Sequence, residues 1–169
     1  MNRIIFTLTF FALMTAKTTA QFEIPETNQK LPYSANEWVD SVLNSLTLEE
    51  KIAQLMNVVA VCNEKADNTE VVKKIVQDFN IGGLILASGD LEREIDLINQ
   101  CQEVAKTPLL ISMDAEWGLG MRFDSTISFP FQMALGAITN DTIIYEMGEE
   151  IARQCKRIGV HTNFAPVVD

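Results

Sequence analysis

The sequence predicts an α/β fold built around a parallel β-sheet. Two observations lead to this prediction. Short apolar runs, typical of strands buried on both faces, recur along the chain, and helical segments with one apolar face alternate with them. Four such strand-and-helix units fit within the 169 residues.

The first elements follow an irregular start. Residues 21–35, with Pro25 and Pro32 among polar residues, are expected to form an irregular lead-in, and the organised domain is expected to begin near Asn36. Thr47 and Glu50 have the spacing of a capping box, in which both side chains bond free backbone amides at a helix start. We therefore predict a helix over residues 48–56 and a strand over 57–61.

The middle of the chain alternates regularly between helix and strand. The apolar spacing predicts helices over residues 68–79, starting at Asn68 or Thr69, and over 91–105. Strands are predicted over residues 81–87 and 108–113, where apolar residues run without a break. A loop region over 114–139 follows the second of these strands.

A long helix and a final strand close the predicted pattern. Asn140 or Asp141 is expected to cap the helix, and a final strand begins at Val160. The buried stripe of the helix is spaced three, four, four and three residues apart, at Ile144, Met147, Ile151, Cys155 and Ile158.

Two architectures accommodate these elements. A (β/α)8 barrel needs about 250 residues, so this chain would hold its first half. A doubly wound open sheet of four or five strands also fits the length. The pattern of elements alone does not separate the two.

The N-terminus resembles a cleavable secretory signal over residues 1–20. Arg3 precedes an apolar stretch, and small residues stand before Gln21. The apolar stretch is about 13 residues long, whereas a membrane-spanning helix needs about 20. No later segment is long and apolar enough to span, so we expect an exported protein in the periplasm or outside a bacterial cell.

Charge and cysteine content exclude some functions. The formal net charge of −10 becomes −12 once Arg3 and Lys17 leave with the signal, which argues against binding of nucleic acid. Cys62, Cys101 and Cys155 are widely spaced, and the last two fall on apolar helix faces, so buried free thiols are favoured over a disulfide. With a single histidine and no paired cysteines, no metal site is expected.

Three segments together resemble the N-terminal domain of glycoside hydrolase family 3. They are residues 46–55 (LTLEEKIAQL), residues 110–118 (LISMDAEWG) with Arg122 and Phe129-Pro130, and residues 159–169 (GVHTNFAPVVD). They occur in the order of the family. Within it, the chain is most similar to the β-N-acetylhexosaminidase branch. The resemblance implies a (β/α)8 barrel, of which residues 36–169 would be the N-terminal half.

The resemblance also implies two sugar-binding residues. Asp114 would accept hydrogen bonds from hydroxyls of the terminal sugar, and Arg122, eight residues later, would contact the same sugar. Trp117 departs from the pattern of many relatives, which have glycine at this position. Its ring could stack on a sugar face or pack under the loop, and we keep both interpretations.

Other candidate residues have structural explanations at this stage. Glu116 is expected to fix the loop, Asp169 to brace the barrel mouth, and His161 to be a core histidine with its hydrogen bonds satisfied. Gly118 and Gly120 hint at a dinucleotide-binding loop, but Phe123 stands where the third glycine would be.

The implied activity is the retaining hydrolysis of terminal N-acetylglucosamine from peptidoglycan or chitin-type glycans, without a cofactor. In the resembled family the nucleophile and the acid/base group come from later loops, so this chain is expected to contain no catalytic residue and to be inactive by itself. A β-glucosidase of the same family is one alternative. A noncatalytic sugar-binding protein is the other, if the chain truly ends at Asp169.

Overall fold

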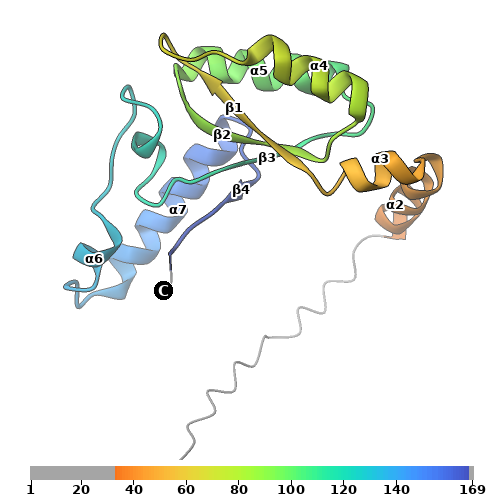
Figure 1. The fold of residues 1–169 in the computed structure, drawn as a ribbon. Helices are drawn as coiled ribbons and strands as arrows, with labels where there is room; N and C mark the ends of the chain where they lie inside the picture. The colour runs from red at the N-terminus through yellow and green to blue at the C-terminus, as the bar shows by residue number, and fades with distance from the viewer. Residues whose placement is uncertain (1–32, 168–169) are drawn as a thin grey trace, which may run out of the picture. The chain divides into compact units, whose positions relative to one another are not determined.

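The computed structural model describes the backbone of residues 33–167 and the side chains of residues 37–167. The expected signal, most of the expected lead-in and Asp169 lie outside the described residues. Helices and strands alternate along the described part of the chain (Figure 1). The elements are α2 (Tyr33–Ser45), α3 (Leu48–Ala53), β1 (Asn57–Cys62), α4 (Thr69–Phe79), β2 (Gly83–Gly89), α5 (Leu91–Val104), β3 (Leu110–Met113), the 3-10 helix η2 (Leu119–Met121), α6 (Gln132–Leu135), α7 (Asp141–Arg157) and β4 (Thr162–Asn163).

The sheet is parallel throughout, and its strands lie in the order β1-β2-β3-β4. Each strand therefore pairs with the next one along the chain. A doubly wound sheet would instead reverse direction and add later strands beside the first. Sequential order is that of a (β/α)8 barrel. The predicted α/β fold, with four units of a barrel, is confirmed.

Most elements lie where the sequence places them, with differences at their ends. The capping box of Thr47 and Glu50 is present, but α3 ends at Ala53, three residues before the predicted end. The chain is already helical at Tyr33, slightly before the domain start expected near Asn36. The loop between β3 and α7 contains two short helices, η2 and α6. None of the helices within residues 33–167 has the length and apolar character needed to span a membrane.

The last strand is much shorter than predicted. β4 covers only two residues, although the apolar run begins at Val160. The ring of His161 explains part of this difference, because its Nδ1 accepts a hydrogen bond of 3.0 Å from the amide of Ile111. The Ile111 amide on β3 thus bonds to the His161 side chain, and it is not available to the main chain of a longer β4.

The core lies between the sheet and the helices that cover one of its faces. Residues paired across parallel strands point to the same face. Two adjacent rows, Leu84 with Ile111 and Leu86 with Met113, are buried. The helices bury residues in the same core cluster: Val72 and Val76 from α4, Leu97, Ile98 and Cys101 from α5, and Ile151 and Cys155 from α7, followed by its C-cap Ile158.

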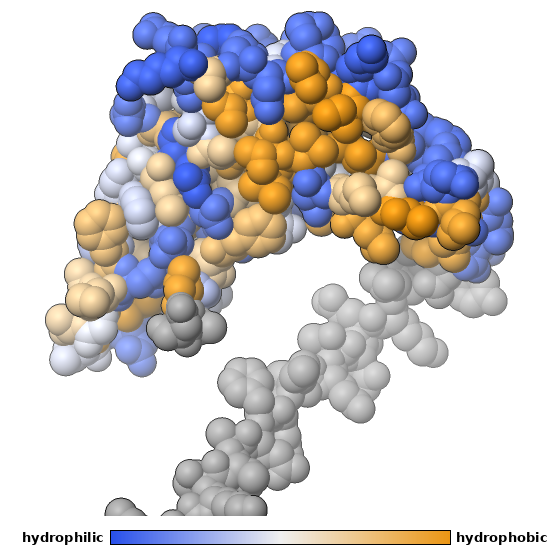
Figure 2. Space-filling model, viewed as in Figure 1, coloured by the Kyte–Doolittle hydropathy of each residue, from blue (hydrophilic) through white to orange (hydrophobic). Residues whose placement is uncertain are grey.

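The opposite face of the sheet is partly open. Val59, Ile85, Ser112 and Thr162 form one row across the strands. Val59 is 46% exposed and Leu110, further down β3, is 51% exposed. Hydrophobic surface is visible over the sheet in Figure 2. The prediction of strands buried on both faces is therefore wrong for this face. In a closed barrel this face would point to the interior.

The stripe of α7 is confirmed, with burial that increases along the helix. Ile151, Cys155 and Ile158 are buried, whereas Ile144 and Met147 are half-buried. Asn140 is the N-cap, since its side-chain oxygen accepts the amide of Thr142.

All three cysteines are buried free thiols, as predicted. Burial raises the pKa of the Cys101 thiol to about 11 and also raises that of Cys155. Both thiols are therefore protonated, and poor nucleophiles, at neutral pH.

Candidate active site

Polar residues gather at the carboxyl edge of the sheet. Asn63 follows β1, Asp90 follows β2 and Asp114 follows β3. A pocket of about 800 Å³ lies at this edge, lined by the loop after β1, the loop after β2 and the segment around η2. Its lining residues are Asn63, Glu64, Lys65, Ser88, Gly89, Asp90, Leu91, Arg93, Met121, Arg122, Asp124 and Ser125. Barrel enzymes place their sites at this edge, so we take this pocket, the edge pocket, as the candidate site.

Asp114 and Arg122, the two residues expected to bind a sugar, are in direct contact. Arg122 donates from Nη2 to the Asp114 carboxylate at 2.6 Å and from Nε to the Asp114 main-chain oxygen at 2.9 Å. The Arg122 side chain is 23% exposed and that of Asp114 is 43% exposed. Arg122 lines the edge pocket, whereas Asp114 does not. The pair therefore presents a guanidinium to the pocket and leaves part of the carboxylate accessible.

Arg122 is positioned by buried neighbours. It ends the turn of η2, where its amide donates to the Leu119 carbonyl at 2.9 Å. Leu119 and Phe123 on either side are buried in the core. Because both anchors are fixed in the protein interior, the intervening segment carries Arg122 to a defined place beside Asp114.

Gly118 and Gly120 are explained by close packing of this loop. Gly118 has φ of +87° and ψ of −176°, a conformation open almost only to glycine. A Cβ there would lie 2.7 Å from Cδ2 of Phe129, and one at Gly120 would lie 2.2 Å from Oγ of Ser128. The two glycines let the chain around residues 118–120 pack closely against Ser128 and Phe129. This accounts for them without a dinucleotide.

Trp117 contacts a neighbouring aromatic ring. Its ring meets that of Phe131 edge to face, with centroids 4.6 Å apart and an angle of 89° between the planes. Trp117 is half-buried, and it does not line the edge pocket. The structure thus accounts for Trp117 as part of the loop packing, while Phe131 remains 63% exposed.

Asn163 is a positioning residue that the sequence analysis did not single out. Its side-chain oxygen accepts the Ala115 amide at 2.8 Å, and its side-chain nitrogen donates to the Ala115 carbonyl at 3.1 Å. The end of β4 is thereby joined to the residue after Asp114. An asparagine at the carboxyl end of a strand was the available signal, since this is where barrel side chains meet.

Glu116 and His161 lie at a different pocket. This pocket, of about 640 Å³, is lined mainly by apolar residues of α7 and by the chain around β4. His161 is exposed, so the prediction of a core histidine is wrong, although its Nδ1 is satisfied by Ile111 as described above. Glu116 contributes its main-chain oxygen to the loop, where it accepts from the Gln132 side chain at 2.7 Å.

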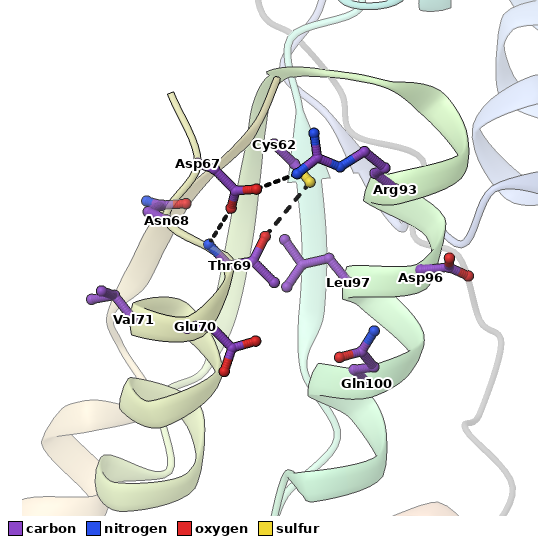
Figure 3. Close-up of a pocket in the computed structure, with 10 residues that line it drawn as sticks. All are labelled: Cys62, Asp67, Asn68, Thr69, Glu70, Val71, Arg93, Asp96, Leu97 and Gln100. Carbon is purple, nitrogen blue, oxygen red and sulfur yellow. Dashed lines mark hydrogen bonds and ion pairs between the residues drawn. The ribbon is translucent and has the colours of Figure 1, made fainter. Parts of the chain in front are cut away.

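A third pocket, of about 460 Å³, lies between the first turns of α4 and α5 (Figure 3). Asp67 and Arg93 form an ion pair there, and the Thr69 hydroxyl donates to the Cys62 sulfur at 3.5 Å. These contacts tie the loop after β1 to α5. Asp114 and Arg122 do not line this pocket, although Arg93 lines both it and the edge pocket.

The charges around the edge pocket are balanced. Its lining contains three acids, Glu64, Asp90 and Asp124, and three bases, Lys65, Arg93 and Arg122. Such a lining offers donors and acceptors without favouring a charged ligand, which suits neutral sugar hydroxyls. Among residues 37–167 no three histidine, cysteine or carboxylate side chains come together as metal ligands would.

The sequence of residues 47–169 matches the family model described as "Glycosyl hydrolase family 3 N terminal domain". The chain belongs to glycosyl hydrolase family 3. The match covers the elements from the capping box of α3 to the end of the chain, including both Asp114 and Arg122.

Curated relatives of the chain carry glycosidase names. A "Beta-N-acetylglucosaminidase/beta-glucosidase" of Cellulomonas fimi is 24% identical over 132 residues, which are 78% of this chain and 23% of that protein. A "Beta-hexosaminidase" of Idiomarina loihiensis is 31% identical over 126 residues, 70% of this chain and 37% of that protein. The chain thus spans about a quarter to a third of the length of these two relatives.

A solved structure of similar fold is that of a β-glucoside phosphorylase, BglX, bound to 2FGlc. It superimposes with a TM-score of 0.67 at 22% identity, over 82% of this chain and 25% of the other. At this identity the likeness shows the fold alone. It agrees with the sequential strand order of a (β/α)8 barrel.

Proposed function

We propose that this chain is the sugar-binding N-terminal part of an exo-acting β-N-acetylhexosaminidase. The whole enzyme would release terminal N-acetylglucosamine from peptidoglycan or chitin-type glycans with retention of configuration, after export to the periplasm or the cell exterior. The contact of Asp114 with Arg122, a residue that lines the edge pocket, is the main support. Family membership and the names of the relatives favour a glycosidase.

The pair suits recognition of a sugar hydroxyl. An ionised carboxylate accepts strong hydrogen bonds, and a guanidinium donates several from a rigid plane. Among the described residues, Asp114 Oδ2 accepts from Arg122 and no hydrogen bond reaches Oδ1. Oδ1 can therefore accept from a hydroxyl while Arg122 holds the carboxylate in place. Bonds of this kind orient the glycosidic bond for attack.

The reacting groups are proposed to come from outside residues 1–169. Retaining hydrolysis needs a nucleophilic carboxylate and an acid/base group on either side of the scissile bond. We expect the isolated fragment of residues 21–169 to contribute sugar contacts without cleaving the bond. Detection of hydrolysis by this purified fragment would overturn this part of the proposal.

A β-glucosidase is the second candidate. The Cellulomonas fimi relative is named for both activities, so its name does not favour one of them. The two sugars differ at carbon 2, where an acetamido group in N-acetylglucosamine replaces the hydroxyl of glucose. Specificity would therefore be set by the groups that surround this position.

The test is hydrolysis by the complete gene product. Purified protein is assayed with chromogenic β-N-acetylglucosaminide and β-glucoside, together with the Asp114→Asn variant and, as a control, Asp78→Asn on α4. Faster cleavage of the N-acetylglucosaminide, lost in Asp114→Asn and kept in Asp78→Asn, supports the proposal. Faster cleavage of the glucoside supports the second candidate, and cleavage of neither supports a noncatalytic sugar-binding protein.

A further inference from the structure

Glu94 is a buried acid without a partner. It is 1% exposed and is the single buried carboxyl among residues 37–167. Neither carboxyl oxygen has a hydrogen-bond partner among the described residues. Burial of an ionised carboxylate without compensation is costly, so the neutral acid is favoured. A neutral acid also gains a donor, which a carboxylate lacks.

The carboxyl group of Glu94 lies against the ends of two strands. A Cβ on Gly89, the last residue of β2, would be 2.5 Å from Glu94 Oε1 and 2.9 Å from the carbonyl oxygen of Cys62, the last residue of β1. Only a glycine leaves room for Glu94 at this point. The Cys62 carbonyl already accepts the Asp90 amide at 3.0 Å and has a second lone pair available.

The charged groups around Glu94 come from two elements. Asp67, on the loop after β1, and Arg93, on α5, form the ion pair drawn in Figure 3. The pKa of Glu94 is raised to about 7, chiefly by burial and also by the negative charge of Asp67, while the positive charge of Arg93 acts in the opposite direction. Since Arg93 is already paired with Asp67, it does not neutralise a second carboxylate.

The loop next to Glu94 forms a wall of the edge pocket. Residues 88–91 join β2 to α5, and all four line the pocket. Asn63 on the neighbouring loop donates to Ser88 Oγ at 3.2 Å, so the two loops are linked. A displacement of Gly89 by Glu94 would therefore move residues that line the edge pocket.

We propose that Glu94, as a neutral acid, is a positioning residue that holds residues 88–91 in the shape needed for sugar binding. This inference rests on the proposed function of the edge pocket. When Glu94 ionises, its carboxylate and the carbonyl of Cys62 repel each other, and the loop moves to let water reach the charge. The sugar-binding wall is then lost while the groups that react with the sugar are unchanged.

The expected result is a KM that depends on pH and a kcat that changes less. With the complete protein and its preferred chromogenic substrate, KM should rise about tenfold from pH 6 to pH 8.5. This is the effect expected if sugar binding raises the pKa of Glu94 by about one unit. Glu94→Gln keeps the size and a donor without the charge, so its KM should stay near the low-pH value throughout. Glu92→Gln, an exposed acid in the same helical turn, is the matched control and should follow the wild type.

A second measurement does not depend on catalysis or on the variant folding. Hydrogen exchange of the amides of residues 88–91 in the wild-type protein should accelerate between pH 6 and 8.5, beyond the intrinsic effect of pH, whereas amides of α7 should not. Equal profiles of KM for Glu94→Gln and wild type, or no such acceleration, would overturn the inference. Absence of hydrolysis by wild type at every pH would instead count against the proposed function, and the exchange experiment would still decide on Glu94.

Discussion

The side-chain amide of Asn163 forms two hydrogen bonds with the main chain of Ala115, at 2.8 and 3.1 Å. The two residues are 48 positions apart in the sequence. Ala115 directly follows Asp114, so the end of β4 fixes the backbone that carries the proposed sugar-binding carboxylate. The contact also explains how a β4 of two residues holds its place beside β3.

Replacement of Asn163 should weaken both stability and sugar binding. Asn163→Ala removes both bonds and leaves the Ala115 amide unpartnered, whereas the Ala115 carbonyl keeps its bond from the Gly118 amide. The loss should cost about 1–3 kcal/mol of unfolding free energy. KM should rise because Asp114 is less well held. Urea unfolding and steady-state kinetics check the two effects. Asn99→Ala, at an exposed position of α5, is the control and should change neither.

Gly118 should not tolerate a side chain. Its backbone conformation alone costs about 1–3 kcal/mol for another residue, and the close approach of Phe129 adds to this. Gly118→Ala should therefore lower the denaturation midpoint. Gly148→Ala offers the opposite case, since nothing lies within 4 Å of a Cβ there. It should stabilise α7 by roughly 0.5–1 kcal/mol. Equal effects of the two changes would contradict this account of the loop.

Ionisation of Glu94 should make the protein less stable as pH rises. The pKa of Glu94 is about 7 in the folded protein and 4.5 for an ordinary glutamate, so between these values the folded state binds more protons. Unfolding free energy should fall by about 3 kcal/mol from pH 4.5 to above 7, and stay low beyond. Glu94→Gln should remove this loss. The measurement is the difference in unfolding free energy between variant and wild type at each pH, and a constant difference would refute the prediction.

The buried thiols should react only after unfolding. Cys101 has a pKa of about 11 and that of Cys155 is also raised, so neither thiolate is populated at pH 8. Iodoacetamide should label Cys62, Cys101 and Cys155 slowly in native protein and rapidly in urea, as followed by peptide mass spectrometry. Rapid native labelling of any of the three would show that it is accessible.

The order of the elements could be predicted from the sequence because each relies on local patterns. The capping box at Thr47 and the stripe of α7 depend on spacing within one helix. Local patterns did not distinguish a barrel from an open sheet. The resemblance to glycoside hydrolase family 3 favoured the barrel, and the sequential strand order of the structure agrees with it. Spacing alone contains no information on which strands become neighbours.

Long-range contacts account for what the sequence did not predict. The ring of the exposed His161 accepts a bond from Ile111 on β3, 50 residues away, and Asn163 bonds Ala115, 48 residues away and just after β3. The edge-on contact of Trp117 with Phe131 likewise depends on how the loop closes. Asp114 and Arg122 were identified through the family motif, but the two bonds between them emerged only from the fold.

The measurement that tests the central claim most directly is sugar binding by the Asp114–Arg122 pair. Calorimetric titration of the complete protein with N-acetylglucosamine is compared for wild type, Asp114→Asn and Arg122→Lys. Arg153→Lys, which alters an exposed arginine–glutamate pair on α7, is the control. We predict a loss of affinity of about tenfold or more, worth at least about 1.4 kcal/mol, in the first two variants and none in the control. Unchanged affinity in Asp114→Asn and Arg122→Lys, with circular dichroism like that of wild type, would contradict the account.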